Sequence, residues 1–415
     1  MRSTDATQYS RSCLTSSLAM ILAAGALLGC SDGPPGPVES LPGLSISPSA
    51  LTLIAGEVES LTARAYDAKD RTTNVSFEWS SADPAVATVG TIDGIVTAIS
   101  LGATTVTAAA GALRATVTVS VVATAGTLSG TFAFTRMTLS AELLPRANHH
   151  SPIFDVLTFS GGDRTPRSLP RPVQFGSIAA PGWSPDGTLL AVEVMHAYFP
   201  YDWGEYSSDL YVLGAAAPAD TPWRALTANG LSRSPSWSPD GKRIAYVQQT
   251  ELWAYSNDIY IIDAAGGEPV RVTRTSGDYG APRWSPDGTR LAFSEGKSSE
   301  IFIVNADGSG LTNVTRNSAW DAEPSWSPDG ARLAFVTNRD GFPGNVFVVD
   351  ADGSNVRRLT SLSGACGGPA WSPDGRQIIF FSSGALYVMN ADGSSLARLI
   401  KMPQNSWDSA PVWRR

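Results

Sequence analysis

The side chains in this sequence best suited to ligand binding are aromatic rings that stand beside carboxylates. Aromatic rings supply contact area with few rotatable bonds, and carboxylates fix orientation, so the combination suits a peptide or a sugar. The candidate binding residues are Tyr201, Trp203, Tyr206, Trp253, Tyr255, Tyr279, Trp320, Asp321, Glu323, Trp407 and Asp408. The alternative is that these aromatic rings only pack long loops onto the rim of the fold.

Signals for catalysis or metal binding are weak. No Gly-x-Ser-x-Gly elbow occurs, and Glu295-Gly-Lys-Ser298 lacks the first glycine of a P-loop. His149-His150 is a possible metal-binding pair, but a solvated pair in a loop is the simpler interpretation, and the same holds for His196. We therefore expect no enzymatic activity, no metal and no cofactor.

The composition favours an all-β chain. Its 415 residues include 39 Gly, 28 Pro and 12 Trp, with 43% hydrophobic and only 16% charged residues. Many turn formers with few charges predict short strands joined by turns. The hydrophobic fraction excludes a disordered chain. The net charge of −8 argues against a nucleic-acid partner.

The N-terminal segment is typical of an export signal. The apolar run over residues 18–28 is too short to span a bilayer but suits a signal peptide. It ends in Leu27-Leu28-Gly29-Cys30, which resembles a bacterial lipobox. The resemblance implies that residues 1–29 are a lipoprotein signal peptide and that Cys30 is lipidated. Ser31 in place of Asp favours the outer membrane of the cell envelope, with the exposed side left open.

A linker and a first β domain follow. Residues 30–42 are rich in Pro and Gly and read as a spacer. Residues 43–123 hold about seven short alternating strands, which fit a β-sandwich. The segment from Trp79-Ser-Ser-Ala-Asp-Pro to Gly94-Ile-Val-Thr-Ala resembles the bacterial Ig-like domain, group 2. That resemblance implies a spacer or adhesive module without chemistry of its own.

The rest of the chain is repetitive. Trp-Ser-Pro-Asp-Gly occurs five times, and a related Ala410-Pro-Val-Trp413 stands near the end. After each complete copy come three more strand patterns, so each unit has the four strands of a propeller blade. In the motif, Pro and Gly suit a tight hairpin, and the Trp can fill the space between blades. The repeat tryptophans are Trp183, Trp237, Trp284, Trp326, Trp371 and Trp413.

The two ends of the repeat region complement each other. The unit at Trp413 has a single strand, whereas the segment from Gly130 begins without a Trp strand. Thr131-Phe-Ala-Phe-Thr matches the second strand of a unit, so we expect the C-terminal strand to complete the first blade. This predicts an all-β chain: an Ig-like β-sandwich followed by a six-bladed β-propeller closed by its C-terminal strand.

Residues 127–415 resemble the TolB-type β-propeller through the repeated Trp-Ser-Pro-Asp-Gly and the later Asn/Asp-Ala-Asp-Gly turns. In TolB the propeller binds the lipoprotein Pal and colicin segments at the mouth of its channel. TolB carries an α/β domain before its propeller and no lipid anchor, whereas an Ig-like domain and a lipobox stand here. The resemblance therefore implies the fold rather than a Tol–Pal role.

The alternation of strands in a blade places the short uniform turns on one face and the variable loops on the other. Variable loops on a rigid scaffold usually carry binding residues, so the variable face is the candidate site. We expect a monomeric, lipid-anchored, non-enzymatic envelope protein that binds a protein or peptide. Its only membrane contact would be the lipid anchor. The alternatives are carbohydrate binding or adhesion and, less favoured, a polysaccharide lyase or hydrolase.

Overall fold

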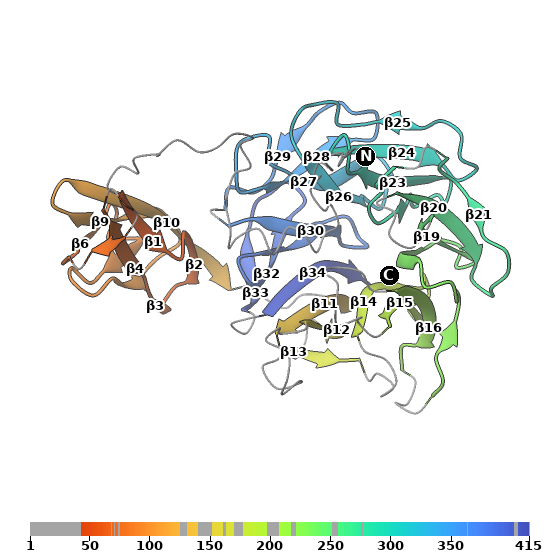
Figure 1. Cartoon of the computed structure of the whole chain (residues 1–415), viewed down its shortest axis with the longest axis horizontal. Helices are drawn as coiled ribbons and strands as arrows, with labels where there is room; N and C mark the ends of the chain where they lie inside the picture. Colours follow the sequence, from red (N-terminus) through yellow and green to blue (C-terminus); the bar gives the residue numbers. More distant parts are fainter. Residues whose placement is uncertain are drawn as a thin grey trace, which may run out of the picture.

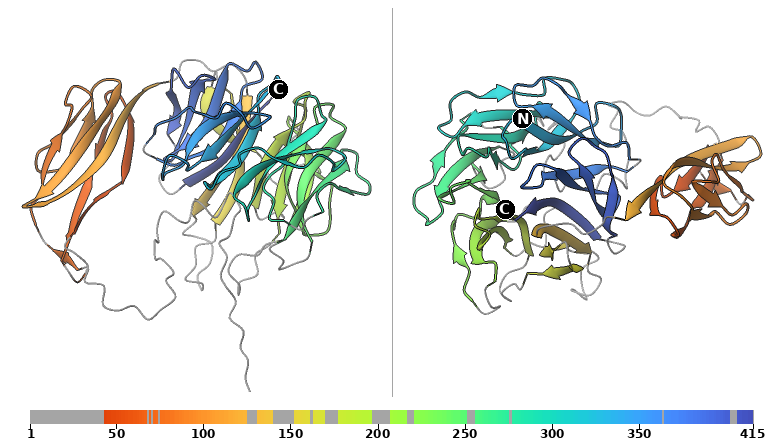
Figure 2. Two further views of the ribbon diagram at one scale, coloured as in Figure 1. Left: turned by 90° about the horizontal axis from the view of Figure 1, so that it is seen from above. Right: turned by 180° about the vertical axis from the view of Figure 1, so that it is seen from behind.

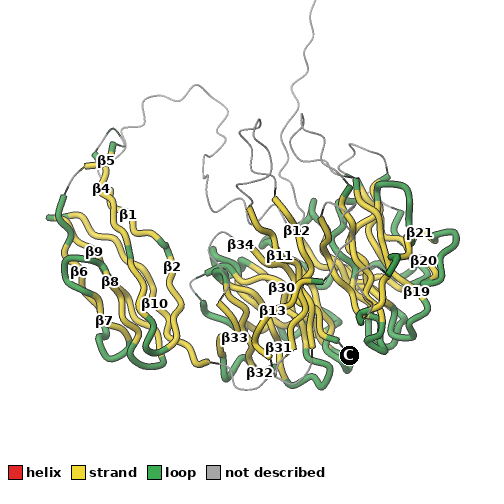
Figure 3. Tube along the Cα trace, turned by 90° about the horizontal axis from the view of Figure 1, so that it is seen from below, coloured by secondary structure: helices red, strands yellow, loops and turns green. Residues whose placement is uncertain are grey.

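A computed structural model describes residues 43–414 with gaps, and the described residues form strands and loops only. The gaps are residues 68, 70, 74, 125–130, 140–151, 161–162, 170–176, 197–206, 217–220, 251–255, 275–276, 363 and 402–405. Within the described ranges there is no helix, hence none long and apolar enough to cross a membrane. The predicted signal peptide, Cys30 and the predicted linker lie outside the described residues. Figures 1 and 3 show a small β region beside a ring of sheets.

The small region, residues 43–124, is called here the Ig-like region. Its strands are β1 (Gly43–Ser47), β2 (Ala50–Ile54), β3 (Val58–Ser60), β4 (Thr62–Tyr66), β5 (Thr72–Thr73), β6 (Glu78–Ser81), β7 (Ala87–Val89), β8 (Ile95–Ala98), β9 (Gly102–Ala110) and β10 (Leu113–Thr124). Alternate residues of these strands point inward, as their pattern predicts, and form one core around Leu53, Trp79, Val106 and Val119.

Four four-stranded antiparallel sheets follow the first four repeats, and the fifth repeat supplies four antiparallel strands of an eight-stranded sheet. Each set of four strands is called here a blade. From the inner to the outer strand they are blade 2, β14 (Ser177–Trp183), β15 (Leu189–Met195), β16 (Ser208–Gly214) and β17 (Arg224–Ala225); blade 3, β18 (Ser232–Trp237), β19 (Arg243–Gln249), β20 (Asn257–Asp263) and β21 (Val270–Arg271); blade 4, β22 (Arg283–Trp284), β23 (Arg290–Glu295), β24 (Glu300–Asn305) and β25 (Thr312–Asn313); blade 5, β26 (Asp321–Trp326), β27 (Arg332–Thr337), β28 (Asn345–Asp350) and β29 (Arg357–Arg358); and blade 6, β30 (Cys366–Trp371), β31 (Gln377–Ser382), β32 (Ala385–Asn390) and β33 (Ala397–Lys401).

Blade 1 combines strands from distant parts of the sequence. It contains β34 (Ser406–Trp413), β11 (Thr131–Leu139), β12 (Pro152–Ser160) and β13 (Asp163–Ser168). The C-terminal strand β34 pairs antiparallel with β11, and Trp413 lies opposite Phe132. The two rings make an edge contact with centroids 5.7 Å apart, and Trp413 is only 7% exposed. The expected pairing of the C-terminal strand with the second strand pattern is therefore present.

Each Trp-Ser-Pro-Asp-Gly copy folds as a hydrogen-bonded turn. In blade 3, the Ser238 hydroxyl donates to Asp240 at 2.5 Å and accepts from the Arg243 amide at 2.9 Å. Gly241 has φ of +70°, a left-handed conformation that favours glycine. The hydroxyl bond from Ser238 and the Lys242 amide hold the pKa of Asp240 below its ordinary value. The same serine–aspartate bond occurs in the other four copies.

The repeat tryptophans pack between adjacent blades. The Trp284 indole donates to the Ser236 carbonyl at 3.1 Å, and the Trp326 indole donates to the Arg283 carbonyl at 3.0 Å. An arginine of the preceding blade also covers each of these rings. The stacked pairs are Arg243 on Trp284, Arg290 on Trp326, Arg332 on Trp371 and Arg414 on Trp183. The Trp413 indole likewise donates a hydrogen bond to the Ala370 carbonyl. These contacts bind neighbouring blades together.

The Ig-like region is joined to blade 6 by a continuous sheet. The last residues of β10 pair in parallel with β33, with Ala123 opposite Ala397. Val122 is buried in the core of blade 6, and Ile54 packs against that core. Figure 2 shows the Ig-like strands standing directly beside this blade. The sequence predicts the first domain as a separate spacer or adhesive module, and this shared sheet is not among its predictions.

Candidate functional site

The described residues enclose a pocket of about 380 Å³ at the centre of the ring. Its wall is formed where the innermost strands enter their Trp-Ser-Pro-Asp-Gly turns. The repeat tryptophans of all six blades contribute to the lining, together with the motif prolines Pro185, Pro286, Pro328 and Pro373. The pocket therefore lies at the face of short uniform turns, opposite the variable loops that sequence reasoning favoured.

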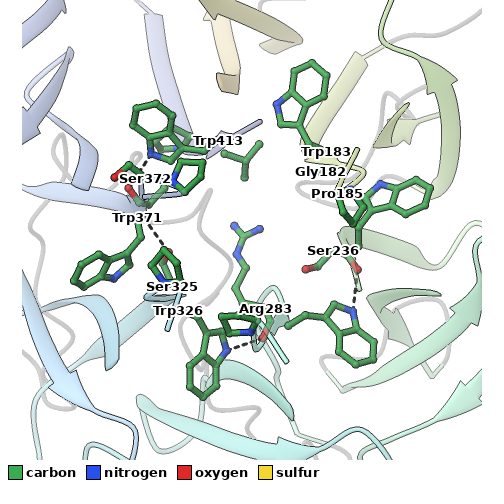
Figure 4. Close-up of a pocket in the computed structure, with 18 of the residues that line it drawn as sticks. Gly182, Trp183, Pro185, Ser236, Arg283, Ser325, Trp326, Trp371, Ser372 and Trp413 are labelled. Carbon is green, nitrogen blue, oxygen red and sulfur yellow. Dashed lines mark hydrogen bonds between the residues drawn. The ribbon is translucent and has the colours of Figure 1, made fainter. Parts of the chain in front are cut away.

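The residue directly before each repeat tryptophan decides the chemistry of the pocket wall. Blades 3, 4 and 5 place Ser236, Arg283 and Ser325 at this position, which forms a polar arc. Blades 6, 1 and 2 place Ala370, Val412 and Gly182 there, which forms an apolar arc. Figure 4 shows Arg283 projecting from its strand into the middle of the ring, with Ser236 and Ser325 on either side.

Arg283 is the one charged side chain in the lining of this pocket. Its backbone carbonyl accepts from the Trp326 indole, so the strand position is held by the neighbouring blade. Burial lowers the pKa of Arg283 from its ordinary value, while the negative charge of Glu323 acts in the opposite direction. A guanidinium stays protonated at neutral pH, so the pocket carries a positive charge.

Four of the six lining tryptophans are covered on one face by an arginine side chain. Trp284 is buried and covered by Arg243, whose guanidinium carbon is 4.8 Å from the ring centroid. Trp371 is likewise buried beneath Arg332. A sugar-binding platform needs an exposed aromatic face, so these rings serve the walls of the pocket rather than a stacking surface.

Much of the predicted variable-face cluster lies outside the described residues. The residues outside the described ranges are Tyr201, Trp203, Tyr206, Trp253 and Tyr255, together with His149 and His150. Trp407 and Asp408 lie in β34, where their backbones are opposite Met137 and Arg136 of β11. The structure thus puts these last two on the innermost strand of blade 1 rather than in a loop.

Two of the predicted binding residues are buried. Tyr279 is 5% exposed and makes an edge contact with Phe293 in the core of blades 3 and 4. Asp321 is 0% exposed and accepts hydrogen bonds from Asn317 at 2.6 Å and from Arg339 at 3.1 Å. Neither side chain is presented to a ligand at the surface, so both act in packing the blades.

Glu323 also has a structural partner. Its carboxylate accepts a hydrogen bond from the Gly368 amide of blade 6, and Glu323 itself adopts a positive φ of 55°. Trp320 is half-buried, and its amide donates to the Asn338 side chain at 2.8 Å. Of the predicted residues whose side chains are described, Trp320 and Glu323 retain exposed surface.

Other carboxylates near the variable loops form hydrogen bonds and ion pairs within their own blades. Asp258 is fully buried, accepts from the Thr273 hydroxyl at 2.7 Å and pairs with Arg271. Glu300 is buried in the same way against Thr315 in blade 4. Across the described residues, no group of three or more His, Cys, Asp and Glu side chains could hold a metal ion.

Sequence reasoning missed Arg283. The available signal was the Pro-x-Trp pattern that precedes every repeat turn, because its central position varies while its neighbours do not. Aligned on tryptophan, this position reads Gly, Ser, Arg, Ser, Ala and Val in chain order. A single charge among small and apolar residues at one repeated position marks a site that differs from the scaffold.

Comparisons with known proteins agree with this architecture. Residues 221–382 match the family PD40, described as TolB beta propeller domain. Residues 41–126 match the family Big_2, described as Bacterial Ig-like domain (group 2). A curated relative, the "Uncharacterized peptidase YuxL" of Bacillus subtilis (strain 168), is 29% identical over 99 residues. That match covers 23% of this chain and only 14% of the relative, so this chain spans a small part of that protein.

Solved structures show the same fold at low sequence identity. TolB from Acinetobacter baumannii has a TM-score of 0.53 and 17% identity, covering 90% of this chain and 100% of that chain. Hydrazine synthase of Kuenenia stuttgartiensis has a TM-score of 0.53 and 14% identity, covering 69% of this chain and 46% of that chain. The described residues are all-β, and the chain contains TolB-type propeller repeats preceded by a group 2 bacterial Ig-like domain.

Proposed function

We propose that this chain is a non-enzymatic scaffold of the cell envelope whose closed six-bladed propeller binds a protein or peptide partner. The observation that carries this proposal is the ligand-sized pocket at the centre of a ring of interlocked blades. Binding sites are mostly preformed concave surfaces with a few placed polar groups, and this pocket has that character. Pairing of β34 with β11 supports closure of the ring, which protects its sheet edges.

The Ig-like region acts in this proposal as a rigid stalk. A shared sheet and buried contacts with blade 6 fix its direction, so the propeller is displayed in a defined orientation. We further propose that Cys30 is lipidated and anchors the stalk to the outer membrane. Replacing Cys30 by Ser should move the chain from the membrane fraction to the soluble fraction. Unchanged membrane association of the variant would contradict the anchor.

Affinity capture from envelope extract tests the scaffold role. The chain from Ser31 onward is immobilised, and retained proteins are identified. We expect one or a few proteins to be retained specifically. If only glycans were retained, for example in a parallel glycan array, the carbohydrate-binding alternative would replace this proposal.

A matched pair of tryptophan variants tests whether the variable face contributes to partner binding. Trp320→Ala removes a half-buried ring on that face, and Trp223→Ala removes a half-buried ring near β17 at the other end of the blades. Weaker capture by Trp320→Ala alone, with similar thermal melts for both variants, would place the partner on the variable face. Equal capture by both would remove that face from the binding site.

A further inference from the structure

We propose that the central pocket is a carboxylate-binding site in which Arg283 holds the carboxylate of a bound peptide. This inference rests on the proposed scaffold role and makes it more specific. It assigns a ligand chemistry to a pocket at the uniform-turn face, where the sequence pattern pointed to no site.

The first argument concerns the hydrogen-bond and ion-pair partners of the Arg283 guanidinium. Its guanidinium has no hydrogen-bond or ion-pair partner among the described residues, although it lies half-buried in the pocket. Other buried arginine contacts in the ring are satisfied, as Arg339 is by Asp321 and Arg398 is by Glu57. Five N–H donors in a planar fork match the two oxygens of a carboxylate.

The second argument is the placement of Glu323. Its charge acts on Arg283, and its carboxylate accepts a hydrogen bond from the Gly368 amide of blade 6. Glu323 is therefore a nearby counter-charge whose carboxylate is held by blade 6, and the guanidinium donors of Arg283 project into the pocket. An incoming anion would face those donors, whereas an incoming cation would face the guanidinium charge.

The third argument is the division of the pocket wall. The hydroxyls of Ser236 and Ser325 flank Arg283 and can donate further hydrogen bonds to carboxylate oxygens. The opposite arc, with Ala370, Val412 and Gly182, suits a small apolar group attached to the carboxylate. A peptide supplies both features, either at its C-terminus or at an acidic side chain.

A peptide fits these observations better than a sugar acid. Trp284, Trp326 and Trp371 are buried and covered by arginine side chains, so they lack the open faces on which a sugar ring would stack. Proline rings and small side chains form most of the remaining wall. The pocket is thus lined for an apolar stem with one anionic end.

Peptide titration tests the proposal on the full chain, with tryptophan fluorescence as the readout because the pocket is lined by tryptophans. Three probes are acetyl-trialanine with a free carboxylate, the same peptide as its C-terminal amide, and acetyl-Ala-Glu-Ala amide. We expect the free acid, the glutamate peptide or both to bind at millimolar concentration and the fully neutral amide to bind at least about tenfold more weakly. The two charged probes distinguish a C-terminal carboxylate from an acidic side chain.

Variants assign the effect to Arg283. Arg283→Gln should weaken binding of the charged probes about tenfold or more and leave the neutral amide unchanged. Arg376→Gln is the matched control, because it removes an exposed positive charge beside a turn at the same face. Equal binding of acid and amide by the wild-type chain, no binding of either charged probe, or unchanged binding by Arg283→Gln would each overturn the proposal.

Capture from envelope extract separates this inference from the scaffold role. If the wild-type chain retains a protein and Arg283→Gln retains it equally, the scaffold stands and the carboxylate site is rejected. If the wild-type chain retains no protein but binds the charged peptides through Arg283, the pocket chemistry stands and the scaffold role is rejected. The thermal melt of Arg283→Gln should match the wild type, because the indole bond of Trp326 uses a backbone carbonyl.

Discussion

Arg398 on the outer strand of blade 6 donates a hydrogen bond to the carboxylate of Glu57 in the Ig-like region, 341 positions away. It also donates to the Thr52 carbonyl at 3.2 Å, and its side chain is only 6% exposed. Burial opposes ionisation of Glu57, but the bonds from Arg398 and the Ile54 amide outweigh it, so the pKa of Glu57 is lowered. One buried guanidinium therefore ties the stalk to the ring.

Replacing Arg398 by Ala should loosen this junction. The variant leaves Glu57 and the Thr52 carbonyl without their charged donor, and we expect a loss of about 2 kcal/mol in the coupling of the two parts. Calorimetry should show the unfolding of the Ig-like region separating to a lower temperature than that of the propeller.

The neighbouring pair Lys401–Glu59 supplies the control. Both side chains are well exposed, at 50% and 34%, so Lys401→Ala should cost less than about 1 kcal/mol. A calorimetric trace for Arg398→Ala identical to that for Lys401→Ala would show that the strand pairing alone holds the junction.

Closure of the ring makes a second prediction at Trp413. This ring is buried against Phe132 and Phe134, and its indole donates to the Ala370 carbonyl at 3.1 Å. Trp413→Ala should lower the free energy of unfolding by about 3–5 kcal/mol, since the core is left with a cavity at the joint between blades. Urea denaturation measures the loss. A loss below about 1 kcal/mol would mean that β34 does not seal blade 1.

The repeated parts of the fold were predictable and the singular parts were not. Each Trp-Ser-Pro-Asp-Gly copy carries its own turn chemistry, so the blades and the pairing partner of β34 follow from local pattern and count. The Arg398–Glu57 contact joins residues far apart in sequence, and no local signal precedes it. Asp321 is buried against Arg339, which lies in the turn after β27, and the local sequence around Asp321 does not show this contact.

The pocket illustrates the same division in another way. The tryptophans that line it are visible as repeat markers, but their role as walls depends on arginines from neighbouring blades that cover their faces. The importance of Arg283 emerges only when the position before tryptophan is compared around a closed ring. Sequence reasoning favoured variable loops, because variation usually marks binding, whereas here one charged residue at a variable position inside the uniform repeat carries the charge.

The turn aspartates make the third prediction, on acid stability. A hydroxyl bond and a backbone amide lower the pKa of Asp240, and the same causes lower the pKa of Asp329. A lowered pKa in the folded state means that the stabilisation is complete above the unfolded value of 3.8 and is lost as pH falls through the folded value. Asp240→Asn should therefore melt at a lower temperature than the wild type at neutral pH.

Melting curves across the acidic range check this prediction. The difference between Asp240→Asn and the wild type should shrink as the pH falls from about 4 through the folded pKa of Asp240, because the wild-type carboxylate becomes protonated over that range. A constant difference at all pH values would show that the charge of Asp240 contributes nothing to the turn. The Ser238 hydroxyl remains in both proteins and so does not affect the comparison.

Glu193 makes the fourth prediction, with the opposite sign. It lies in β15, is 5% exposed, and accepts from the Ser234 amide of blade 3 at 3.2 Å. Burial raises its pKa above the ordinary 4.5, although the charge of Arg233 acts against this. The folded state then binds more protons than the unfolded state, so stability falls as pH rises from 4.5 through the folded pKa.

Glu193→Gln should remove this loss. The glutamine oxygen can still accept from the Ser234 amide, and it carries no charge that burial would disfavour. We expect the variant to gain stability relative to the wild type as pH rises toward 7, by about 1 kcal/mol, in contrast to Asp240→Asn. Urea denaturation at pH 4 and pH 7 measures both variants in parallel. If Glu193→Gln were less stable than the wild type at pH 7 and equal to it at pH 4, attraction between the Glu193 carboxylate and Arg233 would outweigh the cost of burial.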